Sequence, residues 1–138
     1  MTDAVSLPPV TPPGVPPPLH ELETEVMEEI WRSSREVTVH AIRDELNART
    51  DKQRAYSTVM TVMSRLCRKG LLTKQKRGRS DYYAPTLTRE QYLDARAADE
   101  VQSLVAEFGD KALVHFAAHV AKLDPRRRKK LRRLAKGD

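Results

Sequence analysis

Apolar residues recur at helical spacing soon after the start of the chain. In L-H-E-L-E-T-E-V-M-E-E-I-W, residues 19–31, large apolar side chains form one stripe opposite a row of glutamates, which predicts an amphipathic helix. The run V-T-V-H-A-I-R-D-E-L-N predicts a second, short helix that Thr38 caps, with Val39, Ile42 and Leu46 facing inward. The stretch R-T-D-K-Q-R is then predicted to turn the chain into a third helix.

The third helix, predicted within R-A-Y-S-T-V-M-T-V-M-S-R-L-C-R-K-G-L-L (54–72), has an unusual polar face. At about 100° per residue, its apolar side chains share one side: Val59, Val62, Met63 and Leu66. The other side carries hydroxyls and a cation: Ser57, Thr61, Ser64 and Arg68. Surface helices usually mix Glu with Lys, whereas short hydroxyl side chains let the backbone approach DNA and hydrogen-bond to phosphates or base edges. The pattern predicts a recognition helix that stops at Gly70, and the alternative is an amphipathic helix with an ordinary polar face.

A β-hairpin is predicted next, in L-L-T-K-Q-K-R-G-R-S-D-Y-Y-A-P. The turn falls at R-G-R-S, residues 77–80, where glycine permits a tight reversal, and Pro85 ends the returning strand. The tip is cationic, and Tyr82 and Tyr83 behind it are placed to pack on the helices. Three helices followed by a hairpin predict a winged helix-turn-helix, and the alternative for this stretch is a solvated loop with incidental charge.

Three further helical pieces are predicted after Thr88, because Gly109 and Pro125 divide the pattern. The first piece begins at a Thr88 cap and the third at an Asp124 cap. The first two carry apolar stripes: Leu93, Ala97, Val101, Leu104, Val105, Phe108, Leu113, Phe116 and Val120. Such pieces bury little on their own, so we predict that they pack against a second copy and make the chain a homodimer. The basic run 126–133 is interpreted as a solvated face whose stems cover nearby leucines, with added non-specific DNA affinity as the alternative.

These elements predict a mainly α fold in three parts. Residues 1–18 hold seven of the nine prolines and are predicted to be a disordered, Pro-rich tail. A winged-helix DNA-binding domain with a small β-hairpin wing is predicted for residues 19–86, and a helical dimerisation region with a basic end for residues 87–138. Two Phe and one Trp among 138 residues suit a small helical core rather than a large one.

The positive charge of the chain is local. Its net charge is +6 and its pI is near 9.7, which favours a polyanionic partner such as double-stranded DNA. Residues 49–79 contain ten Lys or Arg and one acid, whereas residues 19–36 contain six Glu against two Arg. No apolar run approaches the roughly 18 residues that span a bilayer, and the start lacks the features of a signal peptide. We therefore expect a cytoplasmic location without membrane contact.

Catalysis has no candidate residues in this sequence. The chain contains no glycine-rich phosphate loop, no histidine–carboxylate constellation and no acidic pair on a predicted cleft. We therefore expect that the protein is not an enzyme and that it binds no cofactor. His115 and His119 have the spacing of a two-histidine metal half-site, but no clear third ligand accompanies them, and we expect no metal. Cys67 is the single cysteine, which permits no internal disulfide. It is interpreted as a small core residue, with a redox sensor as the alternative.

The order of elements and the sequence itself resemble the BlaI/MecI/CopY family of bacterial winged-helix repressors, the penicillinase repressor family. The resemblance rests on the helical runs at 19–31 and 37–46, on A-Y-S-T-V-M-T-V-M-S-R-L-C-R-K-G-L-L at 55–72 and on D-Y-Y-A-P at 81–85. It implies a homodimer on a pseudo-palindromic operator, often with TACA/TGTA half-sites, that represses resistance or stress genes. In better-known members a membrane sensor protease leads to cleavage at an Asn-Phe bond. The matching stretch here, F-G-D-K-A-L-V-H-F, lacks that dipeptide, and the paired C-x-C motifs of the copper-responsive branch are absent, so the upstream sensor or protease is unknown.

The predicted DNA contacts combine the third helix with the wing: Arg54, Tyr56, Ser57, Thr58, Thr61, Arg65, Arg68, Lys76, Arg77 and Arg79. We expect the hydroxyl residues and Arg65 to enter the major groove, and the other cations to hold phosphates or the adjacent minor groove. Specificity should then rely on thymine methyl contacts and on half-site spacing fixed by the dimer. The alternative function is a winged-helix module that binds nucleic acid non-specifically or binds protein or structured RNA.

Overall fold

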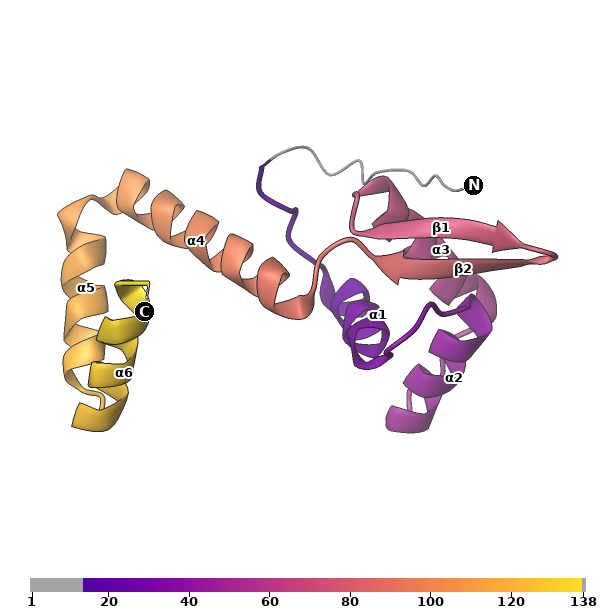
Figure 1. The fold of residues 1–138 in the computed structure, drawn as a ribbon, viewed down its shortest axis with the longest axis horizontal. Helices are drawn as coiled ribbons and strands as arrows, with labels where there is room; N and C mark the ends of the chain where they lie inside the picture. Colours follow the sequence, from indigo (N-terminus) through magenta and orange to yellow (C-terminus); the bar gives the residue numbers. More distant parts are fainter. Residues whose placement is uncertain (1–13, 138) are drawn as a thin grey trace. The chain divides into compact units, whose positions relative to one another are not determined.

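The computed structural model describes residues 14–137, and the chain divides into two compact units, Met1–Ala97 and Ala98–Asp138. Its elements, in chain order (Figure 1), are α1 (Glu21–Arg32), α2 (Val39–Arg49), α3 (Tyr56–Arg68), β1 (Leu72–Arg77), β2 (Ser80–Pro85), α4 (Arg89–Phe108), α5 (Asp110–Ala121) and α6 (Pro125–Ala135). The predicted mainly helical fold with a two-stranded antiparallel hairpin is confirmed. Within residues 14–137, no helix has both the length and the apolar character needed to cross a bilayer.

Side-chain caps set the starts of four helices, because they bind backbone N–H groups that have no partner inside the helix. The His20 N–H donates to the Glu23 carboxylate at 2.9 Å, at the start of α1. The Thr38 hydroxyl, the Thr88 hydroxyl and the Asp124 carboxylate each accept from the N–H of the third helical residue, at 3.2, 3.0 and 2.9 Å. The three predicted caps are therefore confirmed.

The core of the first unit takes one side of each of its helices. The residues predicted to face inward on α2 are buried: Val39, Ile42 and Leu46. Those predicted for α3 are at most 4% exposed: Val59, Val62, Met63 and Leu66. Met27 and Ile30 of α1 and Tyr83 of β2 belong to the same cluster. Burying each large side chain of this kind is worth about 1.5–3 kcal/mol, so core packing decides which side of α3 faces solvent.

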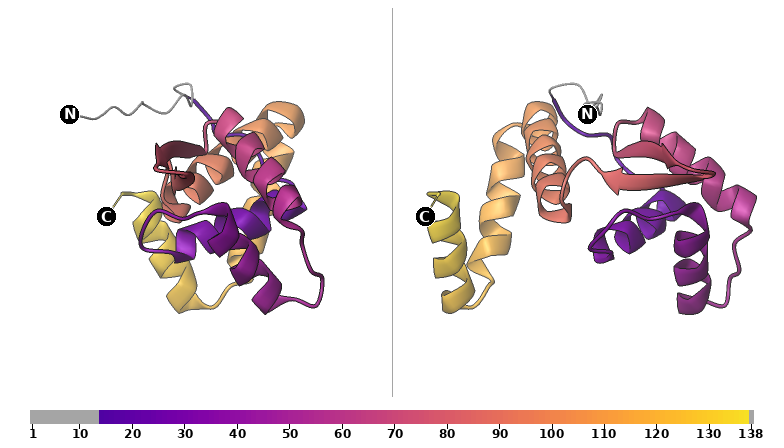
Figure 2. Two further views of the ribbon diagram at one scale, coloured as in Figure 1. Left: turned by 90° about the vertical axis from the view of Figure 1, so that its right-hand side faces the viewer. Right: turned by 45° about the vertical axis from the view of Figure 1, so that its right-hand side comes forward.

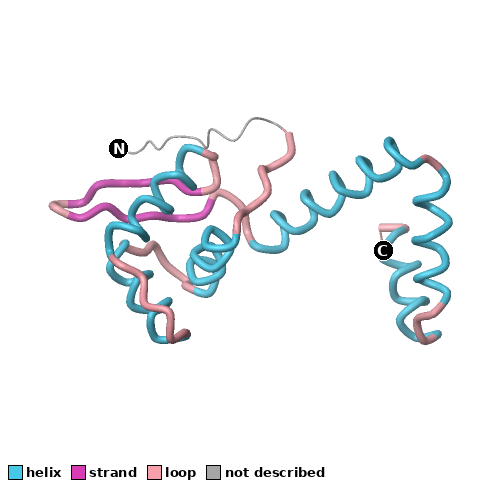
Figure 3. The backbone as a smooth tube through the Cα atoms, turned by 180° about the vertical axis from the view of Figure 1, so that it is seen from behind, coloured by secondary structure: helices cyan, strands magenta, loops and turns pink. Residues whose placement is uncertain are grey.

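The hairpin forms the predicted wing, and it extends beyond the helices (Figures 1 and 3). β1 and β2 pair antiparallel along their whole length around a two-residue turn. The turn contains Gly78 at φ 65°, a left-handed conformation that costs other L-residues about 1–2 kcal/mol. Val37 adds a β-bridge to Tyr83 through backbone hydrogen bonds of 3.0 and 2.7 Å. This bridge was not predicted from the sequence, and it ties the wing to the start of α2.

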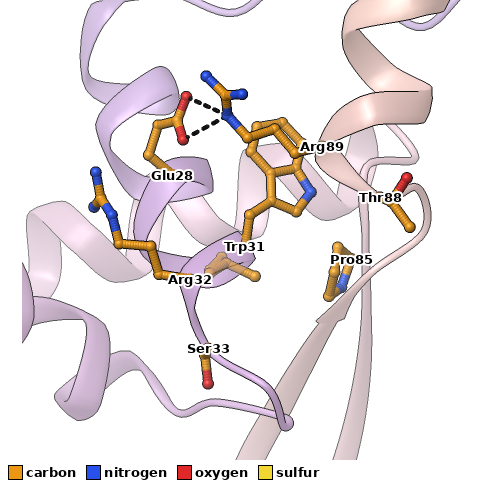
Figure 4. A pocket seen from close by; sticks show the side chains of 8 residues that line it. Glu28, Trp31, Arg32, Ser33, Pro85, Thr88 and Arg89 are labelled. Carbon is orange, nitrogen blue, oxygen red and sulfur yellow. Dashed lines mark hydrogen bonds and ion pairs between the residues drawn. The ribbon is translucent and has the colours of Figure 1, made fainter.

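The first turn of α4 is held on α1 by side chains. The Trp31 indole N–H donates to the Leu87 carbonyl at 3.0 Å, and its ring centroid lies 5.5 Å from that of Tyr92. The Arg89 guanidinium donates to both oxygens of Glu28, at 2.9 and 3.1 Å, beside the same indole (Figure 4). Glu28, Trp31 and Arg89 border a hollow of about 270 Å³ between the end of α1 and the start of α4.

Residues 14–18 correct the prediction of a disordered tail over residues 1–18. Pro16 is fully buried. The carbonyls of Pro16 and Pro17 accept hydrogen bonds from Arg96 and Tyr92 of α4, at 3.3 and 2.9 Å. Proline cannot continue a helix or a central strand, but its carbonyl remains free to accept a hydrogen bond, which is how this segment becomes ordered. Residues 1–13 of the predicted tail lie outside the described residues.

The second unit contains the end of α4 together with α5 and α6, which lie side by side (Figure 2). The Arg128 guanidinium joins these two helices by donating to the Ala121 carbonyl at 2.8 Å. No side chain of α5 or α6 is buried. The residues predicted for dimerisation are exposed in the single chain, apart from the partly buried Val105: Leu93, Ala97, Val101, Leu104, Phe108, Leu113, Phe116 and Val120.

Candidate nucleic-acid interface

The outward side of α3 carries the predicted hydroxyl residues. Ser57, Thr58 and Thr61 are exposed. The cations Arg65 and Arg68 are exposed as well, and neither forms an ion pair within residues 14–137. Because the inward side of α3 is core, the helix cannot rotate about its axis without exposing apolar surface. The fold therefore presents small hydrogen-bonding groups and unpaired positive charge at a fixed orientation.

The first turn of α3 adds an aromatic pair to this surface. Tyr56 is 36% exposed, and its ring centroid lies 4.4 Å from the imidazole of His40 on α2. Met60, one turn after Tyr56, is 41% exposed. His40 and Met60 were not among the residues predicted from the sequence. Met60 could have been found there, because it follows Tyr56 by one helical turn, whereas nothing in the sequence pairs His40 with Tyr56.

The turn between α2 and α3 is closed by Asn47, which was also not predicted from the sequence. Its side-chain amide donates to the Arg54 carbonyl at 3.1 Å, and its side-chain oxygen accepts from the Arg54 N–H at 2.7 Å. The Gln53 amide donates to the carbonyls of Asn47 and Thr50, at 3.1 and 3.2 Å. These bonds fix where α3 begins, so Asn47 positions the candidate interface without belonging to it.

Arg54 and Arg77 differ from the other predicted cations because each has a carboxylate partner. The Arg54 side chain is only 18% exposed, and its guanidinium lies 3.6 Å from the Glu25 carboxylate. Arg77 pairs with Glu36, and its guanidinium carbon also lies 5.3 Å from the centre of the Tyr82 ring. Both arginines must therefore exchange or share a partner in order to contact a phosphate.

The wing supplies two cations that have no ion pair within residues 14–137, Lys76 and Arg79. They flank the Arg77–Gly78 pair at the end of the hairpin, and both are exposed. Long cationic side chains on a projecting hairpin can reach phosphates beside the groove that a recognition helix occupies. The structure thus places most of the predicted contact residues on the outward side of α3 and on the wing.

Two buried glutamates of α1 hold α3 and α2 in place. The Glu23 side chain is 1% exposed, and its Oε1 accepts from the Lys69 ammonium, at the C-cap of α3, at 2.7 Å. Glu29, at 4% exposed, pairs with Arg32 at 2.8 Å and with Arg49 at the end of α2. Burial raises the pKa of Glu23, but the His20 N–H and the Lys69 ammonium outweigh it, and the net pKa is lowered.

Two partly or fully buried side chains of the first unit, Cys67 and Tyr83, have raised pKa values. Burial raises the pKa of the Cys67 thiol, although Lys74 and Arg68 oppose the shift, so the thiol is a weak nucleophile. Burial also raises the pKa of Tyr83 to about 12. Within residues 14–137, no group of three or more His, Cys, Asp or Glu side chains is arranged to hold a metal ion.

Known proteins resemble this chain over most of its length. A family model described as penicillinase repressor matches residues 19–137. The chain is 35% identical over 103 residues to the transcriptional regulator BlaI of Mycobacterium tuberculosis. The aligned residues make up 74% of this chain and 73% of that relative. It is 30% identical over 81 residues to the penicillinase repressor of Bacillus licheniformis, covering 59% of this chain and 61% of that relative.

Two solved structures are also similar. The solution structure of the DNA-binding domain of the repressor BlaI is 29% identical with a TM-score of 0.48, covering 57% of this chain and 93% of that one. The solution structure of the monomeric form of Bacillus licheniformis BlaI in complex with the blaP half-operator is 30% identical with a TM-score of 0.46. The match covers 56% of this chain and 90% of that one. The matched family consists of DNA-binding transcriptional regulators and not of enzymes, which confirms the prediction that this chain is not an enzyme. The chain therefore belongs to the penicillinase repressor family.

Proposed function

We propose that this protein represses transcription as a homodimer that binds a pseudo-palindromic operator of the TACA/TGTA type and controls resistance or stress genes. The observation that carries the proposal is the outward side of α3. There, exposed hydroxyls lie on the same helix as Arg65 and Arg68, which have no ion pair within residues 14–137. Such a surface matches the phosphates and base edges of the major groove. Membership of the penicillinase repressor family supports the same function.

In the proposed complex, α3 lies in the major groove and the wing follows the backbone beside it. Ser57, Thr58 and Thr61 contact bases and thymine methyls, while Lys76 and Arg79 contact phosphates. Arg77 joins them by exchanging Glu36 for a phosphate, because an exposed ion pair is worth only about 0–1 kcal/mol. Tyr56 and its neighbour His40 lie at the N-terminal end of the helix, where recognition helices contact base edges.

The exposed apolar side chains of α4 and α5 support the homodimer. Phe108 is 53% exposed and Leu113 is 48% exposed in the single chain. Large apolar groups on successive helices, with no buried residue on α5, are costly to leave in water. A second copy covers them and also supplies the second recognition helix that a pseudo-palindromic operator requires.

The experiment that tests this function is selection of bound sequences from random duplex DNA by the purified full chain. An inverted repeat with half-sites about one helical turn apart is the expected result. With each subunit neutralising about three or four phosphates, affinity should fall on the order of 10³–10⁴ between 50 and 200 mM salt. Random winning sequences with the same salt response would instead indicate a non-specific nucleic-acid-binding module, and absence of duplex binding would indicate a protein or RNA partner.

A matched pair of substitutions tests the assignment of the interface. Thr61→Ala, on the outward side of α3, should weaken binding to a single half-site roughly fivefold, as expected for the loss of about 1 kcal/mol of contact per subunit. Thr24→Ala, at another exposed threonine, on α1, should leave binding unchanged. Equal effects of the two substitutions would contradict the placement of α3 in the groove.

A further inference from the structure

The proline segment, residues 14–18, packs along the start of α4 within the first unit. Pro16 is fully buried although it precedes the first helix. The Tyr92 hydroxyl donates to the Pro17 carbonyl at 2.9 Å, and the Arg96 guanidinium donates to the Pro16 carbonyl at 3.3 Å. Both donors lie within residues 89–96, the first two turns of α4. The proline segment therefore contacts the part of α4 that also packs on α1.

The composition of this segment suits that contact. Proline has a fixed φ and few accessible unfolded conformations, so ordering a proline-rich stretch loses less entropy than ordering other residues. It has no N–H to satisfy, and its carbonyls accept from side chains in the way that aromatic grooves bind extended proline-rich peptides. The aromatic groups are present here, because Tyr92 is 6% exposed and packs against Trp31. A tyrosine hydroxyl is protonated at neutral pH, because its ordinary pKa is about 10, and burial raises the pKa of Tyr92 further.

Residues 89–96 are thereby held by two different segments. Trp31 and Glu28 of α1 hold them through the ring contact with Tyr92 and the hydrogen bonds to Arg89 (Figure 4). The proline segment holds them through the bonds to Tyr92 and Arg96. α4 is a single helix of 20 residues, Arg89–Phe108, and the contacts with α1 and with the proline segment all fall within its first two turns.

We propose that the proline segment is a positioning element for operator binding, which sets the direction of α4 and thereby the half-site spacing that the dimer accepts. This inference rests on the proposed function. It lies outside the family match, which begins at residue 19. Two recognition helices held at a fixed separation favour one spacing of the operator half-sites. The reason is that binding then costs no conformational entropy for ordering the segments that join the two DNA-binding units. Tyr92 acts here as a positioning residue, since it contacts the segment and not DNA.

Two deletions and one substitution in the full chain test the inference. Deletion of residues 2–18 removes the proline segment, and deletion of residues 2–13 is the matched control that keeps it. Tyr92→Phe removes the bond to Pro17 and retains the buried ring, so it tests the same contact in a variant with an intact core. Each protein is titrated with a duplex holding one half-site, with the full selected repeat, and with repeats whose spacer is one base pair longer or shorter.

The ratio of full-repeat to single half-site affinity is the decisive quantity. Deletion of residues 2–18 should lower it by about tenfold and reduce discrimination between spacers, while half-site affinity is unchanged. Tyr92→Phe should change the ratio in the same direction, and deletion of residues 2–13 should leave it at the wild-type value. A general loss of stability would instead weaken both duplexes together. An unchanged ratio after both the longer deletion and Tyr92→Phe would overturn the inference.

Fluorescence of Trp31, the single tryptophan, separates this inference from the proposed function. The Trp31 indole packs at a tilt against the Tyr92 ring, whose hydroxyl donates to Pro17, so its emission reports whether the proline segment is bound. Emission should change on deletion of residues 2–18 and not on deletion of residues 2–13. If the wild type prefers no DNA site, the proposed function fails. The emission then still decides whether the proline segment packs on α4. Equal spectra for the two deletions would show that it does not, and would overturn the inference.

Discussion

The buried ion pair between Glu23 and Lys69 predicts that its two partners differ in the cost of mutation. The Glu23 side chain is 1% exposed, with one oxygen bound by the Lys69 ammonium at 2.7 Å and by the His20 N–H at 2.9 Å. Its other oxygen, Oε2, has no hydrogen-bond partner within residues 14–137. The Lys69 side chain is 22% exposed, so its ammonium can turn to water when Glu23 is removed, whereas the Glu23 carboxylate cannot.

These contacts set the expected magnitudes. Lys69→Met leaves a buried carboxylate with a single donor, and we expect it to lower the free energy of unfolding by about 3 kcal/mol. Glu23→Gln removes the charge and leaves Lys69 free to reach solvent, at a cost of about 1–2 kcal/mol. The double variant buries no charge, so it should be more stable than Lys69→Met alone.

The pH dependence of stability gives an independent test. The folded-state pKa of Glu23 is lowered from its ordinary value of 4.5, so this carboxylate stabilises the fold above that pH. That contribution is lost as the pH falls through the lower folded-state pKa. In Lys69→Met, burial is opposed only by the His20 N–H, and the pKa of Glu23 should rise. The Glu23 carboxyl should therefore destabilise this variant less as the pH falls toward 4.5, whereas its contribution in the wild type stays constant down to that pH and is lost only below it.

Urea unfolding followed by Trp31 fluorescence measures these free energies at neutral pH and at a series of acidic values. The four proteins of the double-mutant cycle supply their own controls, because they share every other contact. Equal costs for Lys69→Met and Glu23→Gln, or a double variant less stable than Lys69→Met, would refute this account of the ion pair. So would identical pH profiles for Lys69→Met and the wild type.

Three further predictions follow from single sites. Asn47→Ala removes both side-chain bonds to the Arg54 backbone, and it should lower the free energy of unfolding by about 1–2 kcal/mol in urea titrations and weaken operator binding. Gly78→Ala should cost about 1 kcal/mol by the same assay, because φ is 65° and, beyond the two chain neighbours, no atom of the described residues lies within 4 Å of the added methyl group; a neutral result would contradict the turn geometry. Phe108→Asp should leave the thermal stability of the first unit unchanged and shift sedimentation toward the monomer, and a variant that stays dimeric would exclude Phe108 from the interface.

The outward side of α3 could be predicted from the sequence alone. Helical spacing assigned Val59 and Met63 to the core and Ser57 and Thr61 to the surface, and the structure has them there. Residues that position this surface could not be predicted in the same way. Asn47 contacts Arg54 through a turn whose shape depends on the packing of α2 against α3, and no periodicity reveals such a contact.

The prediction for the start of the chain was incomplete for a related reason. A run of prolines excludes helix and central strand, which is a local property that the sequence reveals. Whether the run is ordered depends on donors elsewhere, and Tyr92 lies 75 residues away from Pro17 in the chain. Composition alone therefore could not show that residues 14–18 pack on α4.

By itself, the sequence determined the helices, their caps, the hairpin turn and the division of each helix into an apolar and a polar side. These features depend on interactions within a few residues, such as the bond from the Thr38 hydroxyl to the third residue of α2. Only the tertiary structure decided which distant groups meet: Glu23 with Lys69, 46 residues apart, and Trp31 with Tyr92. The physical reason is that burial selects these pairs, because a buried carboxylate or indole N–H must find a partner wherever packing brings one close.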